Sequence, residues 1–474
     1  MKEETASGSC NSLTAYVAAF VAGTRYDDIP DDVMWLGKKN ILDGLACTLA
    51  GSRAESSGIL HGYIEGLGAY GSAGSASIVG TGRRVSPRFA ALANGTAMHA
   101  DDYDDTLQAE TGRYQAVHPT SPVLPAVLAA AECGARSGRD LLTAYHVGVE
   151  AACRIFDATD VRHILNGFHG TGTCGMVGSA AGVCSLYGLD VATCRIALGI
   201  AASQSCGFQA NFGTMMKPMQ AGRSAECGVV SADLARAGFT ASPIILESPK
   251  GFYQAEGGGY EEPRLRGKLG KPWSFVDRGV WLKPWPTGSL GHPAMTITAQ
   301  IVANNDVKPE QVARLRVRTS ENINTTLFHH RPKTLLEAKF SLEFCLAALA
   351  LQRKLGLTDF TEDFVANPEM QRLIGLIDYD TFTEAEGREM GCTIVTAFVE
   401  IDLKDGRTLA GRADYGKGSK ANPMSDSEVS EKFRDCAAFA GWPGGKTEKA
   451  IDLIWRLEAL DDVRDLTACL ATAD

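Results

Sequence analysis

The side chains most suited to catalysis or binding lie in the acidic stretch "ANGTAMHADDYDDT" at residues 93–106. A run of acidic side chains is usually a solvated loop. The flanking segments are apolar and rich in small residues, so we expect part of this stretch to be buried. A carboxylate held there could orient a histidine or lysine, or act as a base. Histidine beside aspartate also suits a metal ion, but EF-hand spacing and an H-E-x-x-H motif are both absent, and we predict no metal. The stretch contains His99, Asp101, Asp102, Asp104, Asp105 and Thr106.

Four more basic side chains stand in apolar surroundings elsewhere in the chain. His118 precedes an expected helix start, Lys217 lies among three methionines, and Lys283 lies between two tryptophans, nine residues before His292. Each has an ordinary structural interpretation: a capping histidine, or a lysine whose stem covers apolar surface. Burying an ammonium group is costly unless it is paired, so the lysines also suit the binding of an anion.

The stretch "NGFHGTGTCGM" at residues 166–176 contains G-x-G-x-x-G, the pattern of a dinucleotide-binding turn. That function needs a preceding strand and a βαβ unit, and the sequence before Gly170 predicts neither. The glycines more simply allow close packing. They could also form a loop at a helix N-terminus, whose N–H groups favour an anion, with His169 at its mouth.

Taken together, these side chains suit proton transfer on a polycarboxylate. Lysines and imidazoles neutralise carboxylates, and they stabilise the enolate-like species formed beside one. The side chains concerned are Asp102, His118, His169, Lys217, Lys283 and His292.

Composition limits the partners and the compartment. The net charge of −10 argues against a nucleic-acid surface or an anionic membrane as partner. The 13 cysteines include no C-x-x-C pair, which indicates reduced core thiols. The polar N-terminal segment does not resemble an export signal, and no apolar run is long enough to span a bilayer. We therefore predict a cytoplasmic protein.

The elements that must position these residues are mostly helices. Apolar periodicity and capping residues predict helices across residues 30–238, whereas the later segments 311–320 and 392–413 read as strands, the second with an Asp405-Gly406 hairpin turn. Two helices are expected between these strands, and the last 45 or so residues are helical again. The expected early helices cover 31–51, 86–100, 121–134 with Ser121 as N-cap, 139–157, 176–186, 191–203 and 218–237 with Pro218 at the first position. The later two cover 334–354 and 368–376.

The order of seven motifs resembles the MmgE/PrpD family, and the similarity covers nearly the whole chain. It implies a mainly α fold: a large all-helical domain (residues 1–275 and 415–474) and a smaller α+β lid domain (276–414). It also implies a homodimer without a metal or organic cofactor. The motifs are "ANGTAMHADDYDDT", "HPTSPVLPAVLAAAE", "GFHGTGTCG", "MMKPMQAGRSAECGV", "KPWPTGSLGHPA", "KFSLEFCLA" and "GSKANPMSDSEVSEKF".

The resemblance also implies site residues. Two departures from the family pattern bear on the reaction. A long spacer after Thr106 brings Arg113 as an additional candidate for substrate binding, and Phe344 stands where decarboxylase-like members have a lid tyrosine, so it could not donate a hydrogen bond. The expected catalytic residues are Asp102, His118, His169 and Lys217, and the expected substrate-binding residues are Thr106, Arg113, Lys283 and His292.

These features predict an enzyme that moves a proton next to a carboxylate of a small di- or tricarboxylic acid. The first hypothesis is a lyase similar to 2-methylcitrate dehydratase. Epimerisation, as in iminodisuccinate epimerase, and decarboxylation of cis-aconitate use the same groups. Two further alternatives are a non-catalytic polycarboxylate-binding protein and a nicotinamide-dependent enzyme.

Overall fold

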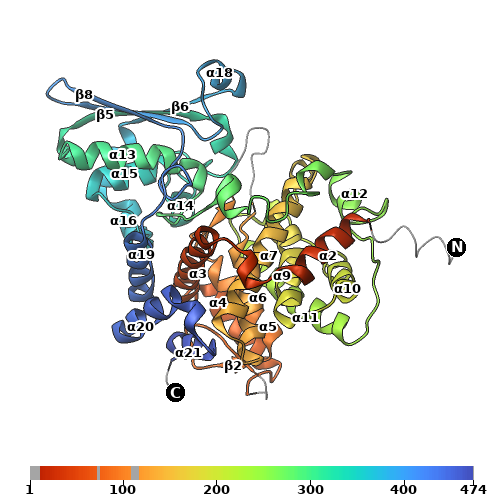
Figure 1. Ribbon diagram of the computed structural model, residues 1–474. Helices are drawn as coiled ribbons and strands as arrows, with labels where there is room; N and C mark the ends of the chain where they lie inside the picture. The colour runs from red at the N-terminus through yellow and green to blue at the C-terminus, as the bar shows by residue number, and fades with distance from the viewer. Residues whose placement is uncertain (1–10, 72–74, 108–116, 473–474) are drawn as a thin grey trace. The chain divides into compact units, whose positions relative to one another are not determined.

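The computed structural model describes residues 11–71, 75–107 and 117–472 (Figure 1). These residues form two compact units: the first holds the described residues up to 280 and those from 425 onward, and the second holds residues 281–424. The first unit is helical and the second mixes helices with a small sheet, so the predicted mainly α fold with a smaller α+β part is confirmed.

The first unit is a layered helical assembly, with α9 (Gly170–Tyr187) at its centre. The remaining helices of the unit are α2 (Leu13–Gly23), α3 (Asp31–Gly51), α4 (Glu55–Gly66), α5 (Pro87–Met98), α6 (Thr120–Cys133), α7 (Gly138–Ala158), α8 (Arg162–Leu165), α10 (Val191–Ala202), α11 (Met216–Arg236), α12 (Phe252–Gly257), α19 (Asp426–Phe439), α20 (Gly444–Trp455) and α21 (Arg464–Thr467). Helix α9 is almost wholly buried, and its main neighbours are α6, α7, α10 and α11.

Small residues allow these helices to approach closely. A Cβ atom added at Gly178 on α9 would lie 2.5 Å from the Cβ of Ala152 on α7. On α11, a Cβ at Gly222 would lie 2.2 Å from the Thr96 hydroxyl and 2.3 Å from the Leu92 carbonyl, both on α5. Because α5 and α11 touch backbone to backbone here, the end of α5 and the beginning of α11 come close together.

The start of α9 differs from the sequence-based expectation in a way that matters for function. The glycines of "GTGTCG" are not a loop: α9 begins at Gly170, six residues earlier than predicted, and His169 is its N-cap. Glycine lowers helix propensity, but here the lack of a side chain relieves contacts with Phe156, Cys206 and Pro122, so packing prevails.

The other corrections concern helix starts and a break. Helix α11 begins at Met216, so Lys217 lies in its first turn and Pro218 is not the first helical residue. Helix α6 begins at Thr120, which places the expected cap Ser121 inside the helix. The helix expected over 334–354 is broken near Ser341, which caps a second helix by accepting from the Phe344 N–H.

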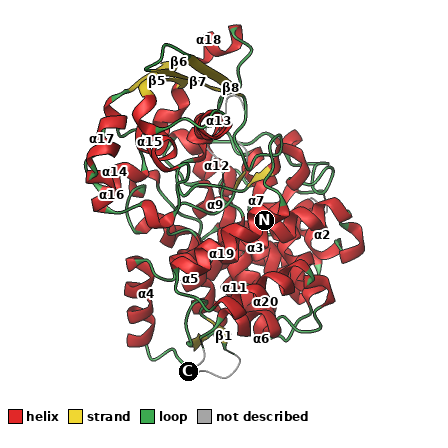
Figure 2. Cartoon of the chain, turned by 90° about the vertical axis from the view of Figure 1, so that its left-hand side faces the viewer, coloured by secondary structure: helices red, strands yellow, loops and turns green. Residues whose placement is uncertain are grey.

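The second unit carries a four-stranded sheet with strand order β6-β5-β7-β8 (Figure 2). Strands β5 and β6 are parallel, whereas β5–β7 and β7–β8 are antiparallel, and the predicted hairpin is confirmed with Gly406 at a φ of 91°. Helix α13 packs against β7 and β8 on one side of the sheet, and α15 packs against α13. The elements are α13 (His292–Asn304), β5 (Val312–Ser320), α14 (Leu335–Lys339), α15 (Leu342–Gln352), α16 (Glu362–Ala366), α17 (Pro368–Gly375), β6 (Ile377–Phe382), α18 (Glu384–Glu389), β7 (Ala397–Leu403) and β8 (Thr408–Ala413).

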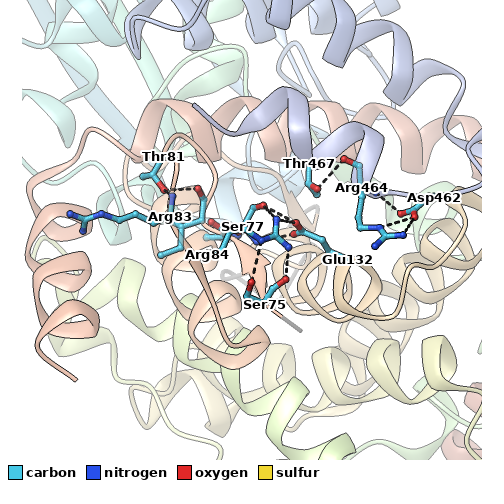
Figure 3. A network of polar contacts seen from close by, with 11 residues as sticks. Ser75, Ser77, Thr81, Arg83, Arg84, Glu132, Asp462, Arg464 and Thr467 are labelled. Atoms are coloured by element: carbon cyan, nitrogen blue, oxygen red, sulfur yellow. Dashed lines mark hydrogen bonds and ion pairs between the residues drawn. The ribbon is translucent and has the colours of Figure 1, made fainter. Parts of the chain in front are cut away.

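A polar network fixes the far end of α6 (Figure 3). The buried Glu132 carboxylate accepts from the Ser77 N–H (2.8 Å), the Ser77 hydroxyl (2.7 Å) and the Arg84 guanidinium (2.6 Å). Ser77 and Arg84 belong to the hairpin of β1 (Ala76–Ser77) and β2 (Arg84–Val85), so this hairpin is joined to α6 by a buried charge. Two further short strands are β3 (Thr106–Leu107) and β4 (Val280–Trp281).

No helix within the described residues combines the length and apolar character that a membrane span requires. No disulfide joins the described cysteines.

Candidate active site

A buried histidine–aspartate pair lies at the end of α5. His99 is the C-cap of this helix, and its Nδ1 donates to the Asp104 carboxylate at 2.8 and 2.9 Å. Both side chains are fully buried. The opposite nitrogen, His99 Nε2, is buried without a hydrogen-bond partner among the described residues. A buried polar atom of this kind is costly in a purely structural residue, so it marks His99 as a functional candidate.

His118 lies beside this pair, just before α6. Its Nδ1 donates to the backbone carbonyl of Asp105 at 2.6 Å and lies 3.6 Å from the Asp104 carboxylate. Its backbone N–H donates to the Thr171 hydroxyl in the first turn of α9 at 3.0 Å. The loop before α6 therefore holds the ring and α9 holds the His118 backbone, with Nε2 as the nitrogen that can exchange a proton.

The Asp105 side chain has a structural role in the same loop. Its carboxyl group accepts from the hydroxyl and the backbone N–H of Thr120, the first residue of α6. Burial raises the pKa of Asp105 well above its ordinary value, partly offset by the Thr120 hydroxyl. The Thr120 hydroxyl in turn lies 2.6 Å from the Tyr145 hydroxyl. This chain of contacts fixes the loop between α5 and α6 that presents the histidines.

His169 supplies a third imidazole. Its Nδ1 lies 2.6 Å from the side-chain carbonyl oxygen of Gln220 on α11. Burial, together with the nearby His99 and Lys217, lowers the pKa of His169 to about 3. His169 is consequently a neutral imidazole at physiological pH.

Lys217 provides a positive charge at the start of α11. Its ammonium group donates to Asp102 at 2.6 Å and lies 5.5 Å from the centre of the Phe212 ring. The same ring packs edge-on against His169, with centroids 5.0 Å apart. Asp102 adopts a φ of 53°, a left-handed conformation that is rare for residues other than glycine. Such backbone strain is often found at functional sites.

The three imidazole rings form one cluster. Their centroids lie 4.6 Å (His99–His118), 5.9 Å (His99–His169) and 6.4 Å (His118–His169) apart. Of the predicted site residues, the structure thus brings together Asp102, His118, His169 and Lys217. Thr106 follows the loop immediately and is buried in β3, where its hydroxyl lies 3.5 Å from the Leu107 carbonyl.

Three other predicted site residues lie outside the described part of the first unit. Lys283 and His292 belong to the second unit, and both are buried rather than exposed; His292 begins α13 and packs edge-on against Trp285. Arg113 lies outside the described residues. Phe344 is fully buried in the core of the second unit against Phe360, so the structure assigns it a packing role.

The sequence alone assigns no role to His99, Asp104 or Gln220. The first two stood in the acidic stretch, and the small-residue helix before them indicated burial. The five-residue spacing of His99 and Asp104 does not by itself predict that they pair, because it depends on the loop conformation. Gln220 carried no signal at all.

The cluster also contains a set of donors that a metal could use. Ligand atoms of His99, Asp104 and His118 lie within 4.8 Å of one another. However, the Nδ1 atoms of both histidines already donate to oxygen acceptors, whereas a metal ligand must present a lone pair. A metal would therefore have to use the Nε2 atoms of these histidines, and the same hydrogen bonds orient the rings for proton transfer.

The sequence comparisons define the class of protein. Residues 15–263 match the MmgE/PrpD N-terminal domain and residues 285–457 match the MmgE/PrpD C-terminal domain. The chain therefore belongs to the MmgE/PrpD family, and it is an enzyme.

The chain is also similar over nearly its whole length to individual proteins of known name. The chain is 28% identical to cis-aconitate decarboxylase of Homo sapiens over 473 residues, which cover 97% of this chain and 94% of the relative. It is 27% identical to cis-aconitate decarboxylase of Aspergillus terreus, covering 99% and 98% of the two chains. A cis-aconitate decarboxylase-like protein of Aspergillus oryzae, oryM, is 26% identical over 97% of each chain.

Proposed function

We propose that this protein is a lyase that decarboxylates an unsaturated tricarboxylic acid of the cis-aconitate type. The observation that carries the proposal is the cluster of three imidazoles, each oriented through Nδ1, beside the Lys217 ammonium group. The relatives named above support decarboxylation rather than the dehydration that the sequence first suggested. None of the relatives described above is named a 2-methylcitrate dehydratase.

The reaction needs one binding charge and one acid. Lys217 would bind a carboxylate of the substrate. The bond between the departing carboxylate and its neighbouring carbon breaks, and CO₂ leaves. The electron pair stays on the carbon, delocalised into the double bond and a second carboxylate. An imidazolium then donates a proton to carbon, which completes a redox-neutral step.

Several expectations remain predictions within this proposal. Thr106, Arg113, Lys283 and His292 are expected to bind substrate, and no metal or organic cofactor is required by the chemistry. The cytoplasmic location and the homodimer are predicted in the same way. Epimerisation and dehydration are the alternative outcomes of the experiment below.

The test is proton NMR of the purified full-length protein in D₂O with cis-aconitate, citrate, 2-methylcitrate and iminodisuccinate. We expect cis-aconitate to lose CO₂ and the product to carry deuterium at the protonated carbon. His118→Asn and His169→Asn should each lower turnover by about 10²- to 10⁴-fold. His61→Gln, a histidine substitution on α4, is the matched control and should leave turnover within about threefold.

Three results would overturn the proposal. Loss of water from 2-methylcitrate without loss of CO₂ would identify a dehydratase. Inversion of iminodisuccinate would identify an epimerase. Tight binding of an acid in calorimetry with no turnover would identify a binding protein.

A further inference from the structure

The three imidazoles of the cluster differ in what accepts their Nδ1 proton. His99 donates to the carboxylate of Asp104 and His118 donates to a backbone carbonyl. His169 faces the neutral side-chain amide of Gln220. A carboxylate partner stabilises an imidazolium, whereas a neutral amide carries no charge to do so. The acceptors therefore distinguish the proton affinities of otherwise similar rings.

The orientation of the Gln220 amide is determined by its second hydrogen bond. Its nitrogen donates to the Phe208 carbonyl at 3.2 Å, so its oxygen is the atom that faces His169. An oxygen can only accept, and the Nδ1 of His169 must therefore carry the proton. In the neutral ring, Nε2 then holds the lone pair. Gln220 is 3% exposed, so water does not compete for this contact.

The surroundings of His169 favour its neutral form. Lys217 on α11 and His99 at the end of α5 both lower the pKa of His169, whereas the Gln220 hydrogen bond and the Asp104 carboxylate raise it. Burial has the largest effect, and the pKa of His169 is about 3. A ring with this pKa holds almost no proton on Nε2 at neutral pH.

We propose that Gln220 is a positioning residue that fixes His169 as the neutral Nδ1–H tautomer, so that the Nε2 lone pair of His169 faces the site and the proton delivered to carbon comes from the His99–His118 pair beside Asp104. The assignment of the acid rests on the proposed function. The tautomer of His169 does not, and it can be measured without substrate.

The first measurement is ¹H–¹⁵N NMR of protein labelled with ¹⁵N only in histidine, with the His169 signals assigned by their loss in His169→Asn. We expect wild-type His169 to be protonated on Nδ1 and not on Nε2 from pH 5 to 8. Gln220→Glu should move its titration upward by about 1 to 3 pH units, because the new carboxylate favours the imidazolium. Observation of the Nε2–H tautomer in the wild type, or an unchanged titration in Gln220→Glu, would overturn the proposal.

The second measurement separates positioning from structural support. Gln220→Leu removes the acceptor and should lower turnover about 10- to 100-fold with little change in KM. The matched control is Gln209→Leu, because the Gln209 amide donates to Ile164 and Phe168 carbonyls of the same region and not to the His169 ring. The control should lower thermal stability but leave the His169 tautomer unchanged. A mixed tautomer in Gln209→Leu would show that general loosening, rather than Gln220, sets the proton position.

If no acid is turned over but the tautomer is as expected, the proposed function fails and the role of Gln220 stands. If turnover is normal but the tautomer is reversed, the proposed function stands and the role of Gln220 fails.

Discussion

At the scale of single residues, the site depends on which oxygen holds each imidazole. His99 is the clearest case, because both oxygens of Asp104 lie within 2.9 Å of its Nδ1 and neither side chain reaches solvent. A carboxylate in this position fixes the tautomer and stabilises the imidazolium that forms during proton transfer. Asp104 is also 3.6 Å from His118, so one carboxylate serves two rings.

Replacement of Asp104 tests this arrangement. In Asp104→Asn the amide can donate to Nδ1, which favours the opposite tautomer of His99 and removes the negative charge. We expect kcat to fall by about 10²- to 10⁴-fold with a smaller change in KM, measured by product formation from cis-aconitate. Asp101→Asn is the matched control in the same loop and should stay within about threefold of the wild type. Equal activity of the two variants would exclude a role for Asp104 in proton transfer.

At the scale of elements, helix α19 stabilises the loop that carries these aspartates. The buried Lys432 ammonium group forms an ion pair with Asp43 on α3 at 2.5 Å and donates to the Tyr103 carbonyl at 2.8 Å. Burial lowers the pKa of Lys432, but the Asp43 carboxylate together with the Cys47 and Cys436 thiols more than offsets it, so the pKa is raised. Tyr103 lies between Asp102 and Asp104, so Lys432 holds this loop through its hydrogen bond to the Tyr103 backbone.

Loss of this lysine should destabilise the whole first unit. Lys432→Met leaves the Asp43 carboxylate buried without its counter-charge, and we expect the free energy of unfolding to fall by about 3 to 5 kcal/mol in urea denaturation. The control is Arg434→Met on the same helix, whose exposed ion pairs with Glu431 and Glu448 should contribute less than about 1 kcal/mol. A loss below 1 kcal/mol in Lys432→Met would contradict this prediction.

At the scale of the whole molecule, buried titratable groups make stability depend on pH in two opposite directions. Burial lowers the pKa of His146 and His163 to about 4 and that of His169 to about 3. Because the unfolded chain binds these protons more readily, their contribution to stability is lost as the pH falls below about 6.5. Burial raises the pKa of Glu256 to about 7, which has the opposite effect.

Glu256→Gln isolates the second contribution. Wild-type Glu256 is protonated in the folded state at low pH and loses that stability as the pH rises from about 4.5 through 7. We expect the free energy of unfolding of the variant, relative to wild type, to increase over this window by up to about 3 kcal/mol. Urea denaturation between pH 4 and 8 measures it. Glu55→Gln at the exposed start of α4 should run parallel to the wild type, and a parallel curve for Glu256→Gln would refute the expectation.

Much of this could be predicted from sequence because the signals are local or ordered along the chain. Seven motifs in a fixed order indicated the family, apolar periodicity predicted the helices, and Asp405-Gly406 predicted the β7–β8 turn. Apolar surroundings singled out Lys217. Glycine was ambiguous: a short glycine-rich run can be a loop or a tightly packed helix, and contacts with Phe156 and Pro122 decided for the helix.

The amino-acid sequence was enough to predict which chemical groups the protein has and most of the helices around them. Only the tertiary structure decided how protons are distributed among those groups. His169 and Gln220 are 51 residues apart and meet because α9 and α11 pack together, with glycine at the close contacts. Lys432 reaches the Tyr103 carbonyl across 329 residues. The state of an imidazole depends on its acceptor and its burial, and both are properties of the packed helices rather than of any local segment.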